Sequence, residues 1–437
     1  MGVFSVFSDK NKRKKNKNTL TPTVEQYYEE RAHRTAALRW ILLLALMLFI
    51  IYGFAFHSEE LTVDNFRYML KFVEFTEKES TGVSLVTFDY GEENKGALYK
   101  GDVVVLNKTG LSIYSEDADR VLSSSFRMGD PRLAVSGTGV LAYDLGGNEV
   151  RMFNSFSQLA LIPTDYPIYG LCVSESGNFA VITSEKNYRT SVYVYDQYAK
   201  QRYHRSLSTV FVDQAALSPD GEELLTLGHY AKNGSFYSVL ERYSIHEEEP
   251  LESITYKNEM PLRLSWLDGD RYAVLTGEAV RIYRKTEKDP IAEYSLSEIS
   301  LQNCLLFEKY ILIISDAEGI SGGTVLTVLD ENLKKLSDTS FDGSIENVSV
   351  INGKIYALMI GSVTELSPDG REKKEYEVSN DVLSVLASAE NEPLLFEKSR
   401  VLKLADAEAD TEMSEEFFPL DEPEEQPTEE QKGEEPV

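Results

Sequence analysis

From about residue 81 to residue 405, short apolar runs alternate with turn residues, and the same arrangement returns eight times. In each copy a turn carrying Gly, Asp or Asn opens one apolar run of strand length, and a second run follows it. Branched aliphatic residues hold alternate positions in second runs such as Val192–Asp196 and Val280–Tyr283. This period of two predicts strands with one buried face. The copies are marked by turn residues at positions 101, 139, 177, 221, 269, 309, 353 and 392.

These turn residues recur at intervals of 38 to 48 positions, with a mean close to 42. A repeat of about 40–45 residues that holds four short strands is typical of a propeller blade. No blade can bury both of its faces alone, so the ring has to close. We find no convincing helix between 81 and 405, which disfavours a helical solenoid. The sequence therefore predicts an all-β fold, a β-propeller of eight blades over 81–405, or of seven if a terminal pair is shared.

An uncharged apolar run precedes the repeats, from Trp40 to Phe56. At about 1.5 Å per residue it spans roughly 25 Å, or about 31 Å when counted from Ala36, which matches a hydrocarbon core. A cleaved signal peptide would have a shorter leader and a shorter apolar run. We therefore predict one uncleaved transmembrane helix over 36–57. Its anchoring residues are expected to include Trp40, Ile41, Leu42, Leu43, Leu44, Tyr52 and Phe56.

Charge is distributed unevenly around this run. Residues 1–39 hold nine Lys or Arg against four Asp or Glu. Basic residues beside a membrane span favour the cytoplasmic side and attract anionic lipid headgroups. We therefore expect 1–35 to be a basic cytoplasmic tail at the bilayer and the repeats to be extracytoplasmic. The residues that set this topology are Arg31, Arg34 and Arg39.

A short amphipathic helix is predicted over 58–80. Thr62 is suited to cap it, and Phe66, Leu70 and Val73 follow on one helical face. That face can pack on the following domain or lie on the bilayer surface.

The other end of the chain is acidic. Residues 405–437 hold fourteen Asp or Glu and one Lys, together with four Pro and two Thr. Such a composition cannot bury enough apolar surface to fold, so 406–437 is predicted to be a disordered tail. Phe417–Leu420 is an apolar island within it, either plain solvated chain or a linear binding motif. The net charge of -28 argues against a nucleic-acid partner, because phosphate contacts need clustered basic residues.

Little of the chain suggests catalysis. Cys172 and Cys304 lie in runs expected to form buried inner strands, three blades apart, and are predicted to be inert core thiols. The His residues after the span lack the spacing of a metal site. Trp266 is the one Trp beyond the span, too few for a quinone cofactor site. We therefore predict no catalytic, cofactor-binding or metal-binding residue, and no enzyme.

Several segments resemble known propeller repeats. Leu217–Leu225 (LSPDGEELL) and Val192–Asp196 (VYVYD) look like WD-repeat and YVTN blades, and Ile351–Tyr376 resembles the quinoprotein-like repeat. The layout of basic tail, single span and propeller resembles a domain-of-unknown-function family of membrane-anchored propellers from Gram-positive bacteria. The resemblance implies a fold and says little about function, because propellers host many activities.

The function expected from these features is a scaffold or recognition module at the cell envelope, with envelope proteins or a cell-surface ligand as partners. Two alternatives stay open: a sensor of a sugar or peptide, and a lyase or hydrolase acting in the central channel. Acids and His converging at the channel mouth would favour the enzyme. An apolar or aromatic rim would favour the scaffold.

Overall fold

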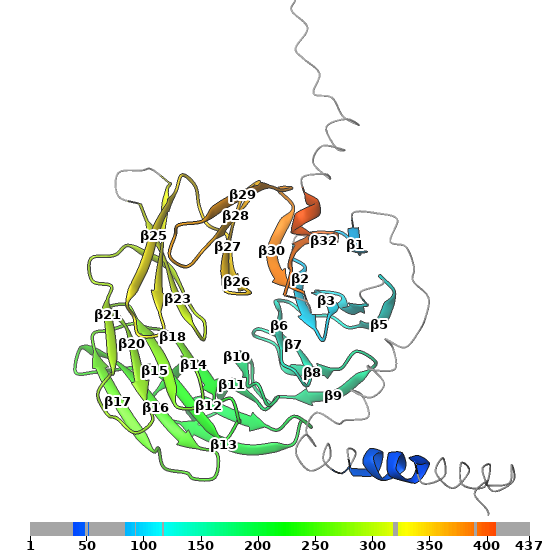
Figure 1. Cartoon of the computed structure of the whole chain (residues 1–437). Coiled ribbons are helices and arrows are strands. Elements are labelled where there is room, and N and C mark those ends of the chain that lie inside the picture. Colours follow the sequence, from blue (N-terminus) through cyan, green and yellow to red (C-terminus); the bar gives the residue numbers. More distant parts are fainter. Residues whose placement is uncertain are drawn as a thin grey trace, which may run out of the picture. The chain divides into compact units, whose positions relative to one another are not determined.

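Each predicted pair of strands forms the two middle strands of a four-stranded antiparallel sheet. The computed structural model describes residues 38–48, 51 and 84–407, apart from 92, 116–117, 318–321 and 389–390. Within 84–407 it contains eight such sheets. They are the blades of an eight-bladed β-propeller (Figure 1). The prediction of eight blades is confirmed, and the alternative of seven is wrong.

The blades follow one another along the chain, and each runs from its inner to its outer strand. The strands of blades 1 to 4 are β2 (Lys95–Tyr99), β3 (Asp102–Asn107), β4 (Gly110–Tyr114) and β5 (Arg120–Ser125); β6 (Pro131–Val135), β7 (Val140–Asp144), β8 (Glu149–Phe153) and β9 (Gln158–Pro163); β10 (Ile168–Val173), β11 (Phe179–Glu185), β12 (Tyr188–Tyr195) and β13 (Gln201–Leu207); and β14 (Phe211–Leu217), β15 (Glu223–Lys232), β16 (Ser235–Ser244) and β17 (Glu252–Lys257).

The strands of blades 5 to 8 are β18 (Pro261–Trp266), β19 (Arg271–Thr276), β20 (Ala279–Arg284) and β21 (Ala292–Ser295); β22 (Leu301–Leu306), β23 (Tyr310–Asp316), β24 (Thr324–Asp330) and β25 (Lys335–Phe341); β26 (Asn347–Ile351), β27 (Lys354–Met359), β28 (Ser362–Leu366) and β29 (Lys373–Glu377); and β30 (Val382–Ala387), β31 (Pro393–Glu397), β32 (Arg400–Lys403) and β1 (Ser84–Thr87). A short 3-10 helix, η1 (Leu404–Asp406), follows β32.

The ring is closed by its first strand. β1 supplies the outer strand of blade 8, where it pairs antiparallel with β32 from the end of the fold. Phe88 extends the junction, because its backbone NH donates to the Ser399 carbonyl at 2.8 Å and its ring stacks on Phe396. The two ends of the propeller are therefore held in one sheet.

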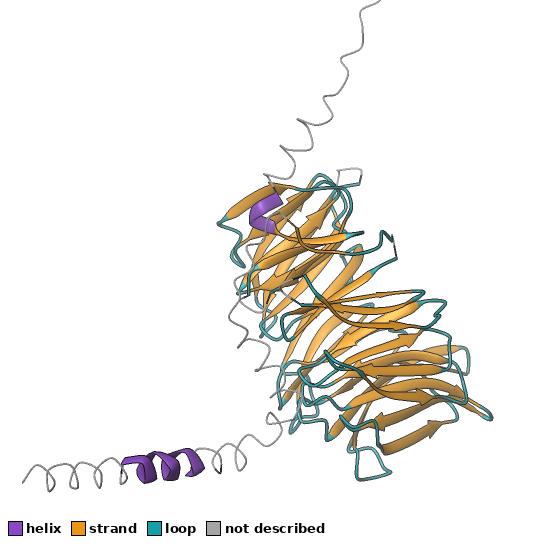
Figure 2. Ribbon diagram, turned by 90° about the vertical axis from the view of Figure 1, so that its right-hand side faces the viewer, coloured by secondary structure: helices purple, strands orange, loops and turns teal. Residues whose placement is uncertain are grey.

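The apolar core lies between the blades. Eight clusters of buried side chains are each formed by two neighbouring blades. Figure 2 shows the blades from the side as tilted, stacked sheets. The middle strands are the most buried, as in β3, whose sequence DVVVLN is buried at its first five positions. Alternation in these strands divides side chains between the two faces of a blade, and each face packs on the next blade.

Two repeat glycines are required by contacts between blades. Gly177 and Gly221 follow inner strands β10 and β14 in turns with φ of +86° and +74°. A Cβ at Gly177 would collide with Thr138, and one at Gly221 with Asn178, each in the preceding blade. Gly therefore meets two needs here, a positive φ and close approach to a neighbour.

The N-terminal unit is described only in part. Residues 38–48 form a helix with exposed side chains. Among the residues that the structure describes, no helix combines the length and the hydropathy needed to cross a bilayer. The predicted segments 1–35 and 58–80 lie outside the described residues.

Candidate functional site

The eight inner strands all begin at one end of the ring, which we call the upper face. First strands of successive blades contact one another, as β10 does with β14 and β14 with β18. In Figure 1 the labels of β2, β6, β10, β26 and β30 surround the centre, and those of β5, β9, β13 and β17 lie at the periphery. The upper face also carries the turns between second and third strands. Side chains at the start of inner strands therefore surround the mouth of the ring.

Five inner strands carry an irregularity near this mouth. In β10, β14, β18, β22 and β30, the pairing register with the second strand shifts at the second or third residue of the inner strand. A β-bulge leaves its extra residue outside the ladder and re-aims the side chain. The residues skipped by the pairing are Tyr169, Asp213, Leu262, Gln302 and Leu383.

Large apolar side chains are exposed on the upper face of three consecutive blades. We call this set the upper rim, and it consists of Tyr169, Tyr188, Phe211, Met260 and Leu262. Tyr169 is 53% exposed although it belongs to an inner strand. Aromatic residues and Met are enriched in protein interfaces, and contiguous exposed apolar surface marks interaction sites. The upper rim therefore has the composition of a protein-binding surface.

A pocket of about 300 Å³ opens within the upper rim, between blades 3 and 4. Its walls are Tyr169 from β10 and Phe211 from β14, and it also contacts Thr190, Val212, Asp213 and His229. Phe211 stacks on His229 with ring centroids 5.5 Å apart, and His229 stacks on Phe236 at 5.4 Å. The pocket thus has aromatic walls and one carboxylate.

Hydrogen bonds hold two neighbouring pocket residues, Val212 and Asp213, in place. Asp213 Oδ2 lies 2.7 Å from His229 Nδ1, across the β14–β15 pair. Burial raises the pKa of Asp213, and the hydrogen bond with His229 offsets only part of that rise. The Val212 NH donates to Thr190 Oγ1 at 3.1 Å, which ties blade 4 to blade 3. The bulged segment is therefore held in place.

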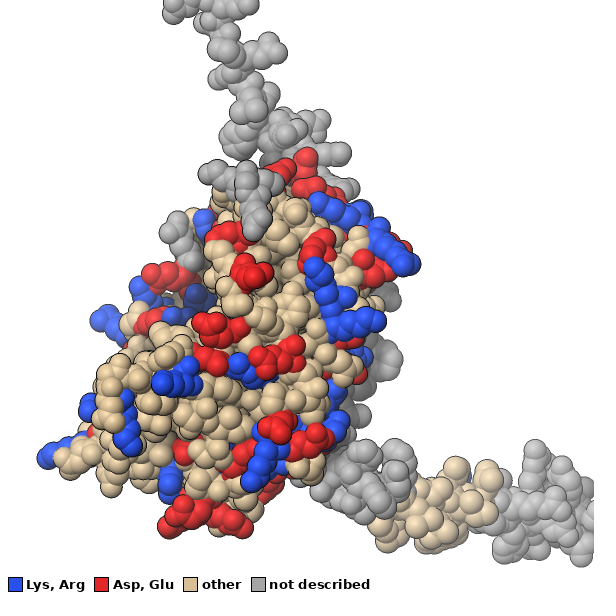
Figure 3. Space-filling view, turned by 90° about the vertical axis from the view of Figure 1, so that its left-hand side faces the viewer, with Lys and Arg blue, Asp and Glu red and all other residues tan. Residues whose placement is uncertain are grey.

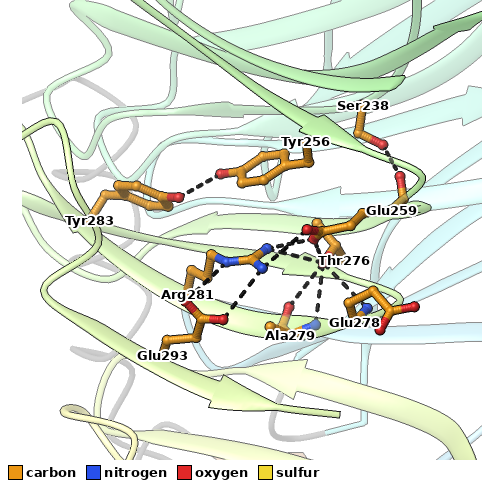
Figure 4. A network of polar contacts seen from close by, with 9 residues as sticks. All are labelled: Ser238, Tyr256, Glu259, Thr276, Glu278, Ala279, Arg281, Tyr283 and Glu293. Carbon is orange, nitrogen blue, oxygen red and sulfur yellow. Dashed lines mark hydrogen bonds and ion pairs between the residues drawn. The ribbon is translucent and has the colours of Figure 1, made fainter. Parts of the chain in front are cut away.

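A polar network holds the upper rim at blade 5 (Figure 4). Arg281 Nη1 lies 2.6 Å from Glu259 Oε2, and Thr276 Oγ1 donates to the same carboxylate at 2.6 Å. Ser238 of blade 4 donates to the Glu259 carbonyl. Met260 follows directly, and its own carbonyl accepts the Gly277 NH at 2.9 Å. An exposed Met is thus presented from a fixed backbone.

One cluster of blade 3 contains residue types used in nucleophilic catalysis. Ser206 Oγ lies 3.0 Å from His204 Nε2 and donates to Glu185 at 2.5 Å, and Ser191 donates to the same carboxylate. In a catalytic triad the carboxylate binds one imidazole nitrogen and the nucleophile binds the other. Here Glu185 Oε2 and Ser206 Oγ both approach His204 Nε2, at 3.6 and 3.0 Å, so the geometry is not that of a triad. Burial raises the pKa of Glu185, but the bonds from Ser191 and Ser206 outweigh it and the net pKa is lowered.

Metal ligands do not gather in the described part of the chain. No group of three or more His, Cys, Asp or Glu residues there is arranged to hold a metal ion. Cys172 and Cys304 are free thiols on inner strands β10 and β22. On the side of the molecule in Figure 3, basic and acidic side chains are interspersed, as on an ordinary solvated surface.

The predicted anchor residues are described only in part. Arg39 and Trp40, and with them Ile41, Leu42, Leu43 and Leu44, lie in the helix at 38–48, where Trp40 to Leu44 are exposed. Arg31, Arg34, Tyr52 and Phe56 lie outside the described residues. The membrane span and its orientation stay predictions.

Sequence reasoning missed the upper rim. Its residues come from different blades, and 42 positions separate Tyr169 from Phe211. His229 and His204 lie in strands β15 and β13, both with partly exposed side chains. The one local signal was Asp213 inside the apolar run at 210–217, a charge where an inner strand should be apolar.

The sequence matches the family described as "Family of unknown function (DUF5711)" over residues 76–404. This chain belongs to that family. The match takes in β1 and all eight blades, so the family unit includes the closing strand. A search of curated proteins finds no match for the sequence.

Solved structures share the fold. Sqt1 of Chaetomium thermophilum, determined bound to the N-terminus of ribosomal protein L10, is similar with a TM-score of 0.52 and 13% identity, over 74% of this chain and 99% of that one. A eukaryotic initiation factor gives a TM-score of 0.50 and 12% identity, over 69% and 81%. BamB from Moraxella catarrhalis gives 0.48 and 10%, over 73% and 99%. At these identities the likeness concerns the fold alone.

Proposed function

We propose that this protein is a membrane-anchored, non-enzymatic β-propeller that binds a protein partner through its upper rim. The single observation that carries the proposal is the exposed apolar and aromatic surface at the bulged starts of the inner strands, including Tyr169 and Leu262. Exposure of such side chains to water does not stabilise a monomer, whereas their burial in an interface makes a favourable contribution to the free energy of binding.

Rigidity adds to the argument. Hydrogen bonds hold the backbone around the upper rim, from the Val212 NH to Thr190 Oγ1 and from Ser238 Oγ to the Glu259 carbonyl. A preformed surface loses little entropy on binding. The same fold in Sqt1, solved with a segment of another protein bound, is consistent with a propeller that serves as a protein-binding platform.

The proposed setting is the cell envelope. An anchor over 36–57 with basic residues before it would leave the propeller on the outer side of the cell membrane. Its partners there would be envelope proteins or a cell-surface ligand of protein nature, and the bilayer would contact the anchor. Anchoring by one span fits a scaffold that collects partners at the membrane.

The test compares two sets of substitutions on the full-length, detergent-solubilised protein. The rim variant carries Tyr169→Ser, Phe211→Ser and Leu262→Ser. The control carries Tyr198→Ser, Leu251→Ser and Leu336→Ser, which remove exposed apolar side chains from the opposite end of the ring. After crosslinking in cells and purification, we expect the rim variant to lose partner bands that the control keeps.

Thermal unfolding should show that both variants fold. If the rim variant melts early, the single change Leu262→Ser serves in its place, because Leu262 is 37% exposed and belongs to neither core cluster of its blade. Partner bands that persist in a folded rim variant would refute the proposed function.

A further inference from the structure

We propose that the pocket between Tyr169 and Phe211 binds an arginine side chain of the protein partner. The inference rests on the proposed function and names the chemistry that the upper rim recognises. It follows from the charge and the ring geometry of the pocket.

The carboxylate of the pocket lacks a permanent counter-charge. Asp213 pairs with His229, an imidazole that carries a charge only when protonated, and no Lys or Arg of the described chain forms an ion pair with Asp213. Glu259, on the next blade of the same face, is by contrast matched by Arg281 at 2.6 Å. Because one oxygen of Asp213 is bonded to His229, the other oxygen is left to accept from a ligand. A cation fits this position.

The walls of the pocket favour a planar cation. Guanidinium groups stack on aromatic faces, whereas an ammonium acts as a compact point charge. The chain itself gives a precedent, because the Arg189 guanidinium lies over the Phe211 ring at 5.0 Å. Arg189 and His229 cover that ring, but Tyr169 has no aromatic or hydrogen-bond partner in the described residues. The incoming guanidinium would stack on Tyr169 and donate to Asp213.

An anionic ligand fits less well. It would have to approach Asp213, whose partly buried carboxylate repels negative charge. Arg189 lies over the Phe211 ring and does not line the pocket. The net charge of -28 also favours partners with basic segments.

The experiment uses immobilised full-length protein and surface plasmon resonance. The probes are a blocked pentapeptide with central Arg between Gly residues, the same peptide with citrulline, and the same peptide with Glu. Citrulline keeps the planar shape and lacks the charge. We expect the Arg peptide to bind at least about tenfold more tightly than the citrulline peptide, the ratio expected of a charge-assisted hydrogen bond. The Glu peptide should not bind.

Asp213→Asn should abolish the preference for Arg over citrulline, and Tyr169→Ala should weaken binding of both. The matched control is Glu222→Gln, which removes the carboxylate of a second His–carboxylate pair, with His246, at the opposite end of blade 4. That variant should bind like the wild type. Each variant is compared by its unfolding midpoint, so that loss of fold is seen separately.

Three results would overturn the inference: equal binding of the Arg and citrulline peptides, an unchanged preference in Asp213→Asn, or tighter binding of spermidine than of the Arg peptide. The last would assign the pocket to a free polyamine. The proposed function is judged separately, because loss of crosslinked partners in the rim variant does not depend on which side chain the pocket takes.

Discussion

The hydroxyl of Tyr256 donates a hydrogen bond of 2.8 Å to the hydroxyl of Tyr283, across the boundary between blades 4 and 5. Both side chains are buried, and Tyr283 also stacks on Tyr272 with ring centroids 5.5 Å apart. Burial raises the pKa of Tyr256 and of Tyr283, so both phenols stay protonated across the physiological range. The aromatic residue that ends the third strand of a blade therefore anchors that blade to the preceding one.

Truncation of these repeat tyrosines should be costly. Tyr283 is 2% exposed and Tyr195, at the equivalent place in blade 3, is 9% exposed. Changing either to Ala should lower the free energy of unfolding by about 3–5 kcal/mol, as for other buried aromatic residues. Tyr283→Phe should cost about 1–3 kcal/mol, because it leaves the Tyr256 hydroxyl without its acceptor. Urea unfolding of the full-length protein in detergent measures each loss.

Tyr237 is the control for that series. It is half-buried and stacks on Tyr230, so Tyr237→Ala should cost only about 1 kcal/mol. A loss at Tyr237 as large as at Tyr283 would contradict the view that burial between blades sets the cost.

The middle strands could be predicted from the sequence because they alternate most regularly. The outer strands could not, since most of their side chains are exposed and only single residues such as Tyr256 reach the core; β29 (KKEYE) shows hardly any apolar pattern. Inner strands such as β14 (FVDQAAL) break the pattern at their bulges. The sequence pattern also does not reveal where β16 begins, because the strand starts at Ser235 and takes in Tyr237. Its hairpin with β15 is longer than the motif suggested.

The candidate site was beyond sequence reasoning for another reason. It is formed where neighbouring blades meet, so Tyr169 and Phe211 become adjacent only through the curvature of the ring. Ring closure is equally non-local, since β1 pairs with a strand more than 300 residues later. The rim carries the apolar and aromatic side chains expected of a scaffold, and beside them it carries the Asp213–His229 pair.

Two arginines of β20 offer a matched pair for electrostatics. Arg281 and its partner Glu259 are 11% and 17% exposed, whereas Arg284 and its partner Glu287 are 41% and 47% exposed. Arg281→Ala should cost about 3–5 kcal/mol, because Glu259 is left as a poorly solvated charge. Arg284→Ala should cost less than about 1 kcal/mol. Denaturant unfolding measures the free energy of unfolding of both variants. Equal losses for Arg281→Ala and Arg284→Ala would contradict the prediction.

The two thiols should resist alkylation. Burial raises the pKa of Cys172 to about 11 and that of Cys304 to about 12, although Cys172 as a whole residue is partly exposed. A raised pKa leaves little thiolate at pH 8, and the thiolate is the reactive form. Iodoacetamide at pH 8, followed by mass spectrometry, should label neither Cys in the native protein and both in urea. Rapid labelling of the native protein at either position would contradict this.

The proposed membrane orientation predicts a protease pattern. Trypsin added to intact cells should remove the 81–405 region and leave an N-terminal epitope intact, because the basic residues before the span, including Arg31 and Arg34, favour the cytoplasm. In permeabilised cells the epitope should be lost as well. Protection of the large domain in intact cells would refute the orientation without touching the fold.

The closing strand should determine the stability of the whole ring. Val86 of β1 is buried between blades 8 and 1, so Val86→Asp places an unpaired charge in that core and should cost at least about 3 kcal/mol. Val86→Ile is the conservative control. Deleting 84–87 should go further, because it exposes the edge of β32 to pairing with other chains, and light scattering should then detect association.

Deleting 408–437 should leave the melting temperature nearly unchanged, since the last described core residue is Ala407, 3% exposed in the cluster between blades 7 and 8. If that deletion melted the propeller while Val86→Asp did not, the acidic segment and not β1 would be the element that closes the ring.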